Sequence, residues 1–410
     1  MAEAMQDTRS QRAGLWLTLL LAAMVLLNYV DRGAIGIAAP KLKDELMLSA
    51  ATFGVVVSAF SWIYAPAQFA VGWLSDRFCV YRMIAAGLGV WALATLLTGF
   101  ANGFAMLVVL RVMLGIGEGV AFPSASKIIA RHVTAERRGL ANGAVAVSLA
   151  WGPALGIFAG GLILRYFGWR PIFFTFGSIT LLWIVPWLFV SRPQWRSYAR
   201  GSGMDVPVSR IMRNRTVWLM GIGHFSNTYG FYFLLAWLPL FLVKARGIPI
   251  LEMTGMITVA YVVQGFGALG WGWLSDRLVK TGWDEGRVRI GLMCVYHLVS
   301  AASILGIGLS TSASMILAWL VLGAVFGGIG GAHVYAIAQI FAGPRASGTW
   351  VGVMNGVGNM SGIVGPILTG VLIEQSGSYM PAFLVSAAIV GFGALWWWVA
   401  LPKIEQVEFD

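Results

Sequence analysis

The sequence predicts an all-α membrane protein with twelve transmembrane helices arranged in two six-helix bundles. Three observations predict this fold: the composition, the number of long apolar stretches, and a repeat that relates the two halves. Hydrophobic residues make up 58% of the chain and charged residues only 11%, whereas soluble domains carry roughly 25% charged residues. The mean hydropathy is +0.78. Most of the chain is therefore expected to lie in lipid.

The apolar stretches have the length of about 20 residues that crosses a bilayer as a helix. The first follows Arg9 and Arg12 and resembles a secretory signal, but no small-residue cleavage site comes after it, so we interpret it as a transmembrane helix. The twelve expected spans lie near 15–39, 50–74, 83–101, 103–127, 138–164, 171–190, 216–243, 253–274, 288–309, 313–340, 347–373 and 380–401.

Two motifs recur in the same order in both halves. The hexapeptide Gly-Trp-Leu-Ser-Asp-Arg occurs at 72–77 and at 272–277, and the segment 139–153 aligns without a gap on 352–366. Such internal repeats are typical of secondary transporters, in which one half rocks against the other around a site near the bilayer midplane. The repeat divides the chain into an N-terminal bundle, a linker and a C-terminal bundle: 1–190, 191–215 and 216–410.

The basic residues predict the orientation in the membrane. With the N-terminus inside, cytoplasmic segments hold 20 of the 28 Lys and Arg residues, and the outer loops hold 6. This asymmetry follows the positive-inside rule and places both termini in the cytoplasm. The linker 191–215 carries six arginines, which indicate an anchor near anionic lipid; a regulatory role is the alternative. Cys79 and Cys294 form no metal or redox spacing.

The six spans, the basic linker, the six further spans and the repeated Gly-x-x-x-Asp-Arg loop resemble the major facilitator superfamily. The resemblance implies a cytoplasmic latch between the halves, and a set of solvated loop charges is the alternative. Cys79 stands where the family pattern usually has glycine. The latch residues implied are Asp76, Arg77, Arg82, Asp276 and Arg277.

Three further segments are similar to the anion:cation symporter family, which includes bacterial galactonate and hexuronate transporters, sialin and the vesicular glutamate transporters. These segments are Asn28-Tyr29-Val30-Asp31-Arg32, Arg111 with Glu118, and 224–239. Vesicular glutamate transporters carry an arginine at the position that we align with Asn227. Its absence here argues against glutamate or another dianion as substrate.

Only four charged residues lie away from the ends of the spans: Asp31, Arg32, Arg111 and Glu118. Each costs about 2.5 to 3.5 kcal/mol at a helix centre, so such residues are expected to face one another or a cavity. Their formal charges sum to zero. Helical rise places Arg111 about 10 Å deep, level with Asp31, and Glu118 two turns further in. We therefore expect an Asp31–Arg111 contact and a separate, more cytoplasmic Glu118.

These charges suggest a mechanism. Protonation of Glu118 or Asp31 leaves the cluster at +1, and the arginines can then bind a substrate carboxylate. Arg32, Arg111 or both can make this contact. By resemblance, Arg32 is the first candidate for the carboxylate, and Asp31 and Glu118 are the proton sites. Tyr29 and Tyr64 are expected to line the cavity. A static salt-bridge network is the alternative interpretation.

Neutral polar side chains in the second half are candidates for contacts with a polyol. Asn355 and Asn359 share a helix face at i, i+4. Each of these side chains also suits an interhelical hydrogen bond. The candidates are Asn227, Tyr229, Asn355 and Asn359.

The expected function is proton-coupled import of an organic monocarboxylate, most favourably a sugar acid such as a hexuronate or aldonate, by alternating access. Uptake of an aromatic carboxylate is one alternative, and a proton/anion antiporter that exports metabolites or drugs is another. A membrane-embedded enzyme or receptor has little support, because the sequence shows no metal-ligand cluster, nucleophile–base pair or phosphate-binding loop. We expect no cofactor, no nucleic acid, a monomer, and location in a bacterial cytoplasmic membrane.

Overall fold

The computed structural model describes residues 2–132, 135–196 and 206–409. Within these ranges the side chains of 2–15, 75–77 and 130–144, among others, are not described. The described residues form helices and contain no strand. The prediction of an all-α membrane protein is confirmed.

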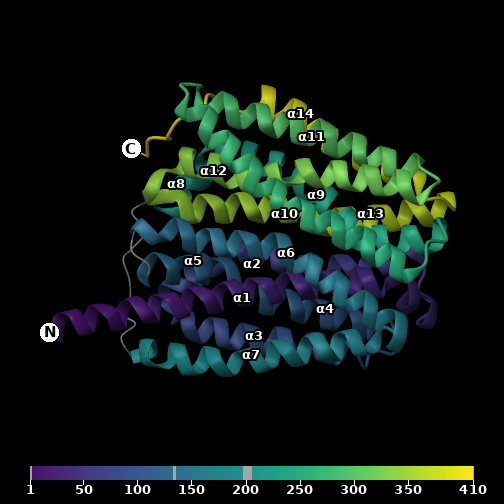
Figure 1. Ribbon diagram of the computed structural model, residues 1–410, viewed down its shortest axis with the longest axis horizontal. Coiled ribbons are helices and arrows are strands. Elements are labelled where there is room, and N and C mark those ends of the chain that lie inside the picture. Colours follow the sequence, from purple (N-terminus) through teal and green to yellow (C-terminus); the bar gives the residue numbers. More distant parts are fainter. Residues whose placement is uncertain (1, 133–134, 197–205, 410) are drawn as a thin grey trace.

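The helices of the N-terminal half lie together in Figure 1, coloured purple to teal, and those of the C-terminal half lie beside them, coloured teal to yellow. The first group is α1 (Ala2–Glu45), α2 (Ala50–Arg77), α3 (Val80–Thr98), α4 (Phe104–Glu118), α5 (Ala121–His132), α6 (Ala135–Phe167) and α7 (Arg170–Arg196). The second is α8 (Val208–Arg213), α9 (Arg215–Leu240), the π-helix η1 (Phe241–Ala245), α10 (Ile250–Lys280), α11 (Glu285–Leu309), α12 (Ala313–Asn359), α13 (Ser361–Ser376) and α14 (Met380–Val399).

Each half packs as a bundle of its own. In the first half α1 packs on α6, and α3 packs on α4 and α7; in the second α12 packs on α10 and α11, and α11 packs on α14. The halves meet where α2 packs on α13 and α12, α6 on α10, and α1 on α9. The boundaries 1–190, 191–215 and 216–410 stay a prediction, and 197–205 lie outside the described residues.

Eleven helical segments in the described part of the chain are long and apolar enough to cross a membrane. The expected fourth span, 103–127, is missing from this set because it is divided: α4 ends at Glu118 and α5 begins at Ala121. Proline has no N–H, so Pro123 cannot donate to the carbonyl of Gly119, and a helix tends to break at this point. The two helices together cover the expected span, with a break that the sequence analysis did not predict.

The expected break between 313–340 and 347–373 is present inside α12. Helical residues lie on both sides of Gly343, but Gly343 itself has φ +61° and ψ 179°, far from helical values, so the helix is kinked there. A positive φ favours glycine, which has no Cβ. The crossings on either side run from Ala313 to Gly343 and from Gly348 to Ser376.

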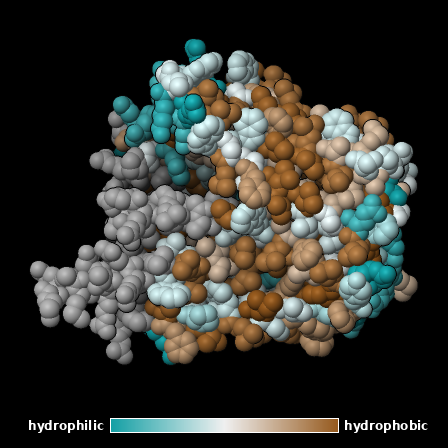
Figure 2. All heavy atoms as spheres, in the orientation of Figure 1, coloured by the Kyte–Doolittle hydropathy of each residue, from teal (hydrophilic) through white to brown (hydrophobic). Residues whose placement is uncertain are grey.

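The surface has the pattern of a protein surrounded by lipid. Figure 2 shows hydrophobic side chains over the middle of one face and hydrophilic ones gathered toward its ends. Along α10, Phe266, Leu269 and Trp273 are each about 60% exposed and follow one another at helical spacing. Large apolar side chains on the outside are stable only in an apolar solvent, so these residues face the bilayer.

Candidate functional site

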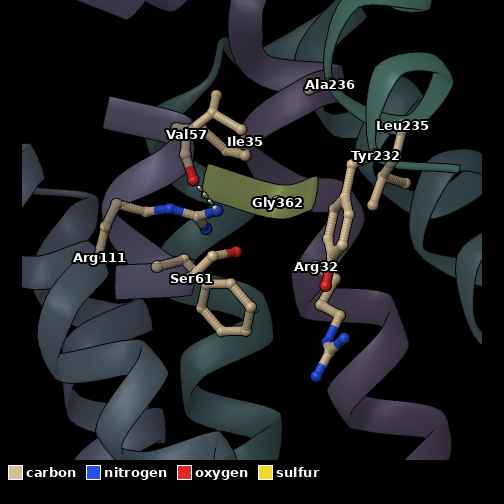
Figure 3. A pocket seen from close by; sticks show the side chains of 10 residues that line it. Arg32, Ile35, Val57, Ser61, Arg111, Tyr232, Leu235, Ala236 and Gly362 are labelled. Carbon is tan, nitrogen blue, oxygen red and sulfur yellow. Dashed lines mark hydrogen bonds between the residues drawn. The ribbon is translucent and has the colours of Figure 1, made fainter. Parts of the chain in front are cut away.

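A small cavity, with about 20 Å³ of space for the centre of a water molecule, lies between the two bundles. In Figure 3, Arg111 and Arg32 lie on opposite sides of Ser61 and Gly362, and Tyr232 approaches from the C-terminal half. The N-terminal half contributes α1, α2 and α4, and the C-terminal half contributes α9 and α13. Binding sites in proteins are concave and mostly apolar with a few converging polar groups, and this cavity has that character.

Arg32 and Glu118 form a buried ion pair beside the cavity. The Arg32 Nε donates to Glu118 Oε2 at 2.9 Å, and the two side chains are 5% and 0% exposed. The guanidinium also lies over the rings of Tyr29 and Tyr64, at 4.9 and 4.4 Å from the ring centroids. Cation–π contacts of this kind are strongest away from water. Tyr29 and Tyr64 therefore contact Arg32, but they are not among the residues that line the cavity, where the sequence placed them.

The expected contact between Asp31 and Arg111 is absent. Asp31 Oδ2 accepts from Trp91 Nε1 at 2.6 Å, with the hydroxyls of Thr95 and Thr180 at 3.5 and 3.4 Å. Asp31 therefore faces α3 and α7 and points away from α4. Neighbouring residues on a helix do not face the same side, so Asp31 and Arg32 cannot both reach α4.

The separate position expected for Glu118 was also wrong, because Arg32 binds it. Long side chains on a helix lean toward its N-terminus. For α1 that direction takes the Arg32 guanidinium toward the level of Glu118, which lies about two turns from Arg111 along α4. Depth along a helix axis gives the level of a Cα atom, whereas an arginine side chain reaches well beyond that level.

Arg111 is the cation of the cavity without a carboxylate partner among the described residues. Its Nη2 lies 3.5 Å from the carbonyl oxygen of Val57, a long hydrogen bond. Its guanidinium lies 5.3 Å from the centroid of the Phe60 ring, and its Nε has no partner. The side chain is 7% exposed. A buried guanidinium with so few acceptors can bind an anion that enters the cavity.

The polar residues of the C-terminal half are joined by hydrogen bonds. Tyr232 donates to Asn359 Oδ1 at 2.6 Å, and Asn359 Nδ2 donates to the carbonyl of Asn355 at 2.8 Å. The Asn355 side chain pairs with His224 at 2.9 Å and accepts from Tyr335 at 3.1 Å. Asn355 is therefore held by other side chains, and Asn359 reaches the cavity through Tyr232.

Two other residues expected from the sequence lie away from the cavity lining. Asn227 Oδ1 accepts from the hydroxyl of Tyr296. Tyr229 is 1% exposed, in the interior of the C-terminal half. Tyr232 and Ser61 do line the cavity and were not among the expected residues. Tyr232 and Leu235 are three residues apart and therefore share a face of one helix. This spacing is the sequence pattern that could have placed Tyr232 on the same face as Leu235.

The expected latch residues lie at the end of the molecule that carries the termini. The side chains of Asp76 and Arg77 lie outside those that the structure describes. The others contact residues of their own half: Arg82 lies over Trp195, Arg277 over Trp273, and Asp276 is 4.0 Å from Arg289. The latch between the halves stays a prediction.

Comparison with known proteins decides the family. Residues 21–363 and 256–409 match the model of the Major Facilitator Superfamily. The chain belongs to this superfamily. The fold agrees, because a bacterial homologue of the human lysosomal transporter Spinster superposes with a TM-score of 0.78 at 19% identity, covering 95% of this chain and 97% of that one.

Relatives within the superfamily include transporters of organic anions. The chain is 30% identical to a probable sulfoacetate transporter of Cupriavidus necator, with 92% of this chain and 91% of the relative covered. It is 28% identical to the hexuronate transporter of Bacillus subtilis, with 92% of both covered. It is 29% identical to the D-galactonate transporter of Escherichia coli O6:H1, with 96% of both covered. These relatives agree with the anion:cation symporter resemblance, and they are transporters and not enzymes.

Proposed function

We propose that this protein is a proton-coupled symporter that imports an organic monocarboxylate, most favourably a sugar acid, by alternating access. The observation that carries the proposal is the unequal pairing of the two cavity arginines. Arg111 has no acidic partner among the described residues, while Arg32 is held by Glu118. The relatives that are hexuronate and D-galactonate transporters support the choice of a sugar acid.

Arg111 is the first anchor of the substrate carboxylate in this proposal. It makes one long contact with the Val57 carbonyl, so an entering carboxylate loses little by replacing that contact. A guanidinium binds a carboxylate through two parallel hydrogen bonds, which also fix its orientation. Ser61 lies between the two arginines in the cavity lining and can add a hydroxyl contact.

Glu118 is the coupling site in this proposal. While it is ionised, its charge is opposite to that of Arg32 and occupies the Arg32 Nε. Protonation removes that charge, so Arg32 becomes available to the substrate and the four-residue cluster rises from zero to +1. A proton on Glu118 thus favours the anion, and by thermodynamic reciprocity the bound anion favours the proton. This linkage is what symport needs.

Asp31 is the second proton site that we propose. It has no cationic partner among the described residues, and its Oδ1 makes no hydrogen bond there. A carboxylate this far from water is costly as an unpaired anion. Protonation would remove that cost without a direct effect on the cavity, because Asp31 faces Trp91.

Tyr232 and Asn359 are proposed to recognise the hydroxyls of the substrate. Their mutual hydrogen bond fixes the Tyr232 phenol at the cavity wall. A sugar acid offers several hydroxyl groups, whereas an aromatic carboxylate offers a flat apolar ring. Tyr232 is the polar residue of a wall otherwise formed by Leu235, Ala236 and Gly362, and its hydroxyl favours a substrate that carries hydroxyl groups.

The membrane orientation remains part of the proposal. The excess of Lys and Arg in the segments on one side favours cytoplasmic termini in a bacterial inner membrane. We propose a monomer, because both bundles that form the cavity belong to one chain.

The first experiment is a thermal-shift screen of purified protein against galactonate, galacturonate, sulfoacetate and benzoate. A ligand that binds the folded state raises its melting temperature by mass action. We expect a shift with a sugar acid. A shift with benzoate alone would favour the aromatic alternative, and a shift with none of these acids would contradict the substrate class.

The second experiment uses proteoliposomes and the acid that binds. We expect uptake to accelerate when the outside is made acidic. If an inward proton gradient instead drives the anion out, the protein is an antiporter, and if the gradient changes nothing, proton coupling is refuted.

A further inference from the structure

The turn between α1 and α2 is held on both sides by the C-terminal half. Asp44, in the last turn of α1, forms an ion pair with Lys244 of the π-helix η1. Glu374, near the end of α13, accepts the backbone N–H of Ala51 in the first turn of α2 at 2.8 Å. Both contacts lie at the end of the molecule opposite the termini, which we call the distal end.

Each contact stabilises a helix end: one gives an acceptor to a free N–H group at the start of α2, and the other neutralises an acid at the end of α1. The first N–H groups of a helix have no partner inside it, and a negative charge there is stabilising. Ser49 caps Thr52 from within the N-terminal half, so Ala51 receives its acceptor only from the other half. Asp44 sits at a helix C-terminus, where an acid is unfavourable unless a cation such as Lys244 neutralises it.

Closer to the cavity, the halves touch backbone to backbone. A Cβ added at Gly36 would collide with the carbonyl oxygen of Leu235, and one added at Gly54 would collide with that of Pro366. Gly370 meets the carbonyl of Ala50 in the same way. Close helix approach of this kind allows Cα–H···O contacts and leaves no room for side chains.

Gly36 is one turn beyond Arg32, and its partner Leu235 lines the cavity. We call Gly36, Gly54 and Gly370 the glycine seal. Its contacts begin at the cavity and continue to the distal end. On the side of the termini, by contrast, the contact at Gly356 is with the edge of the Phe69 ring. A ring can rotate, but a backbone seal opens only when whole helices separate.

We propose that Lys244 and Glu374 form a state-dependent clasp on the α1–α2 turn, and that this clasp and the glycine seal together close the distal end of the transporter. The clasp is made of charges that become solvated when the halves part, so its contacts exist in one state only. The glycine seal sets how closely the halves meet. Weakening the clasp or the glycine seal shifts the population toward the form that is open at the distal end.

The test measures access to the cavity and requires neither substrate nor proton gradient. Cys79 and Cys294 are replaced by serine, and Ser61→Cys supplies a single reporter in the cavity lining. The reporter is labelled with a membrane-impermeant maleimide in right-side-out and in inverted vesicles, so that access from each side is measured separately.

Two variants of the reporter protein test the proposal: Glu374→Ala weakens the clasp, and Gly36→Ala disturbs the glycine seal. Their matched controls are Glu252→Ala, an exposed acid at the start of α10, and Gly89→Ala, whose added Cβ meets nothing within 4 Å. We expect labelling from the distal side to rise several-fold in both variants and to stay unchanged in both controls.

Labelling rates equal to those of the controls in both variants would overturn the proposal, and so would faster labelling from the side of the termini. If Gly36→Ala does not fold, Glu374→Ala decides alone, because its side chain is on the surface. Since the assay uses no anion, its failure would leave the proposed transport function standing, and failure of that function would leave this assay intact.

Discussion

Replacing Glu118 by Gln is the perturbation that separates a coupling site from a structural ion pair. Glutamine keeps the size of the side chain and resembles the protonated acid, because it carries no charge. In the proposed mechanism the 2.9 Å bond between Arg32 Nε and Glu118 Oε2 competes with substrate for the guanidinium. The variant removes that competition permanently, so it should bind the anion as the protonated wild-type protein does.

The size of the effect follows from the bond that is lost. A hydrogen bond to a charged group contributes about 1.5 to 3 kcal/mol, and about 1.4 kcal/mol corresponds to a tenfold change in affinity. The variant should therefore bind the anion roughly 10-fold to 100-fold more tightly at pH 8 than the wild-type protein. The unliganded variant should be less stable, because it leaves the buried Arg32 without a counter-charge.

The assay is calorimetric titration of the purified proteins with the acid found by thermal shift, between pH 5.5 and pH 8. Wild-type affinity should rise as the pH falls, because proton and anion favour each other, and the variant should lose most of this dependence. Glu252→Gln, an exposed acid at the start of α10, is the control. Equal affinity at pH 8 and an equal pH slope in Glu118→Gln and wild type would refute the reasoning.

Three further predictions concern the surroundings of the site. Arg111→Lys keeps the charge but loses the planar fork, so anion affinity should fall about tenfold or more while its pH dependence remains; unchanged affinity in the same titration would exclude Arg111 as an anchor. Trp91→Phe removes the 2.6 Å donor to Asp31 and should cost about 1 to 3 kcal/mol of stability, seen as a lower melting temperature in detergent. Gly117→Ala places a Cβ against the backbone of α3 and should cost about 1 to 3 kcal/mol or more, as overpacking does. Gly89→Ala, with open space around it, should be neutral, and equal melting temperatures for the two alanine variants would contradict the packing argument.

The fold was predictable because lipid leaves few choices. Backbone groups in a bilayer must be satisfied within the chain, so long apolar stretches become helices whatever their detailed sequence. The repeat at 72–77 and 272–277 and the basic linker then indicated two bundles. The divided fourth span was missed because hydropathy does not detect the effect of Pro123 on the helix at Gly119.

The presence of four charged residues inside the spans could be read from the sequence, and their pairing could not. Charges inside spans are costly, so Asp31, Arg32, Arg111 and Glu118 were conspicuous. Which arginine meets which acid depends on the rotation of α1 and on the direction of a long side chain, and neither follows from depth along the helix. The actual pair, Arg32 with Glu118, emerges only in the folded structure.

Neutral and interfacial residues gave weaker signals. Tyr232 carries no insertion cost that would mark it, although it lines the cavity. Asp44, Lys244 and Glu374 lie at the ends of spans, where charged residues are ordinary. Only the way the two halves meet brings them together.

The most direct test of the coupling mechanism is to measure protons and substrate in one vesicle. Proteoliposomes that enclose a pH-sensitive dye, with no gradient imposed, receive the anion from outside. We predict that the lumen becomes acidic as the anion enters, and that Glu118→Gln protein carries the anion with a much smaller pH change. Anion uptake by the wild-type protein without acidification of the lumen would contradict proton-coupled symport.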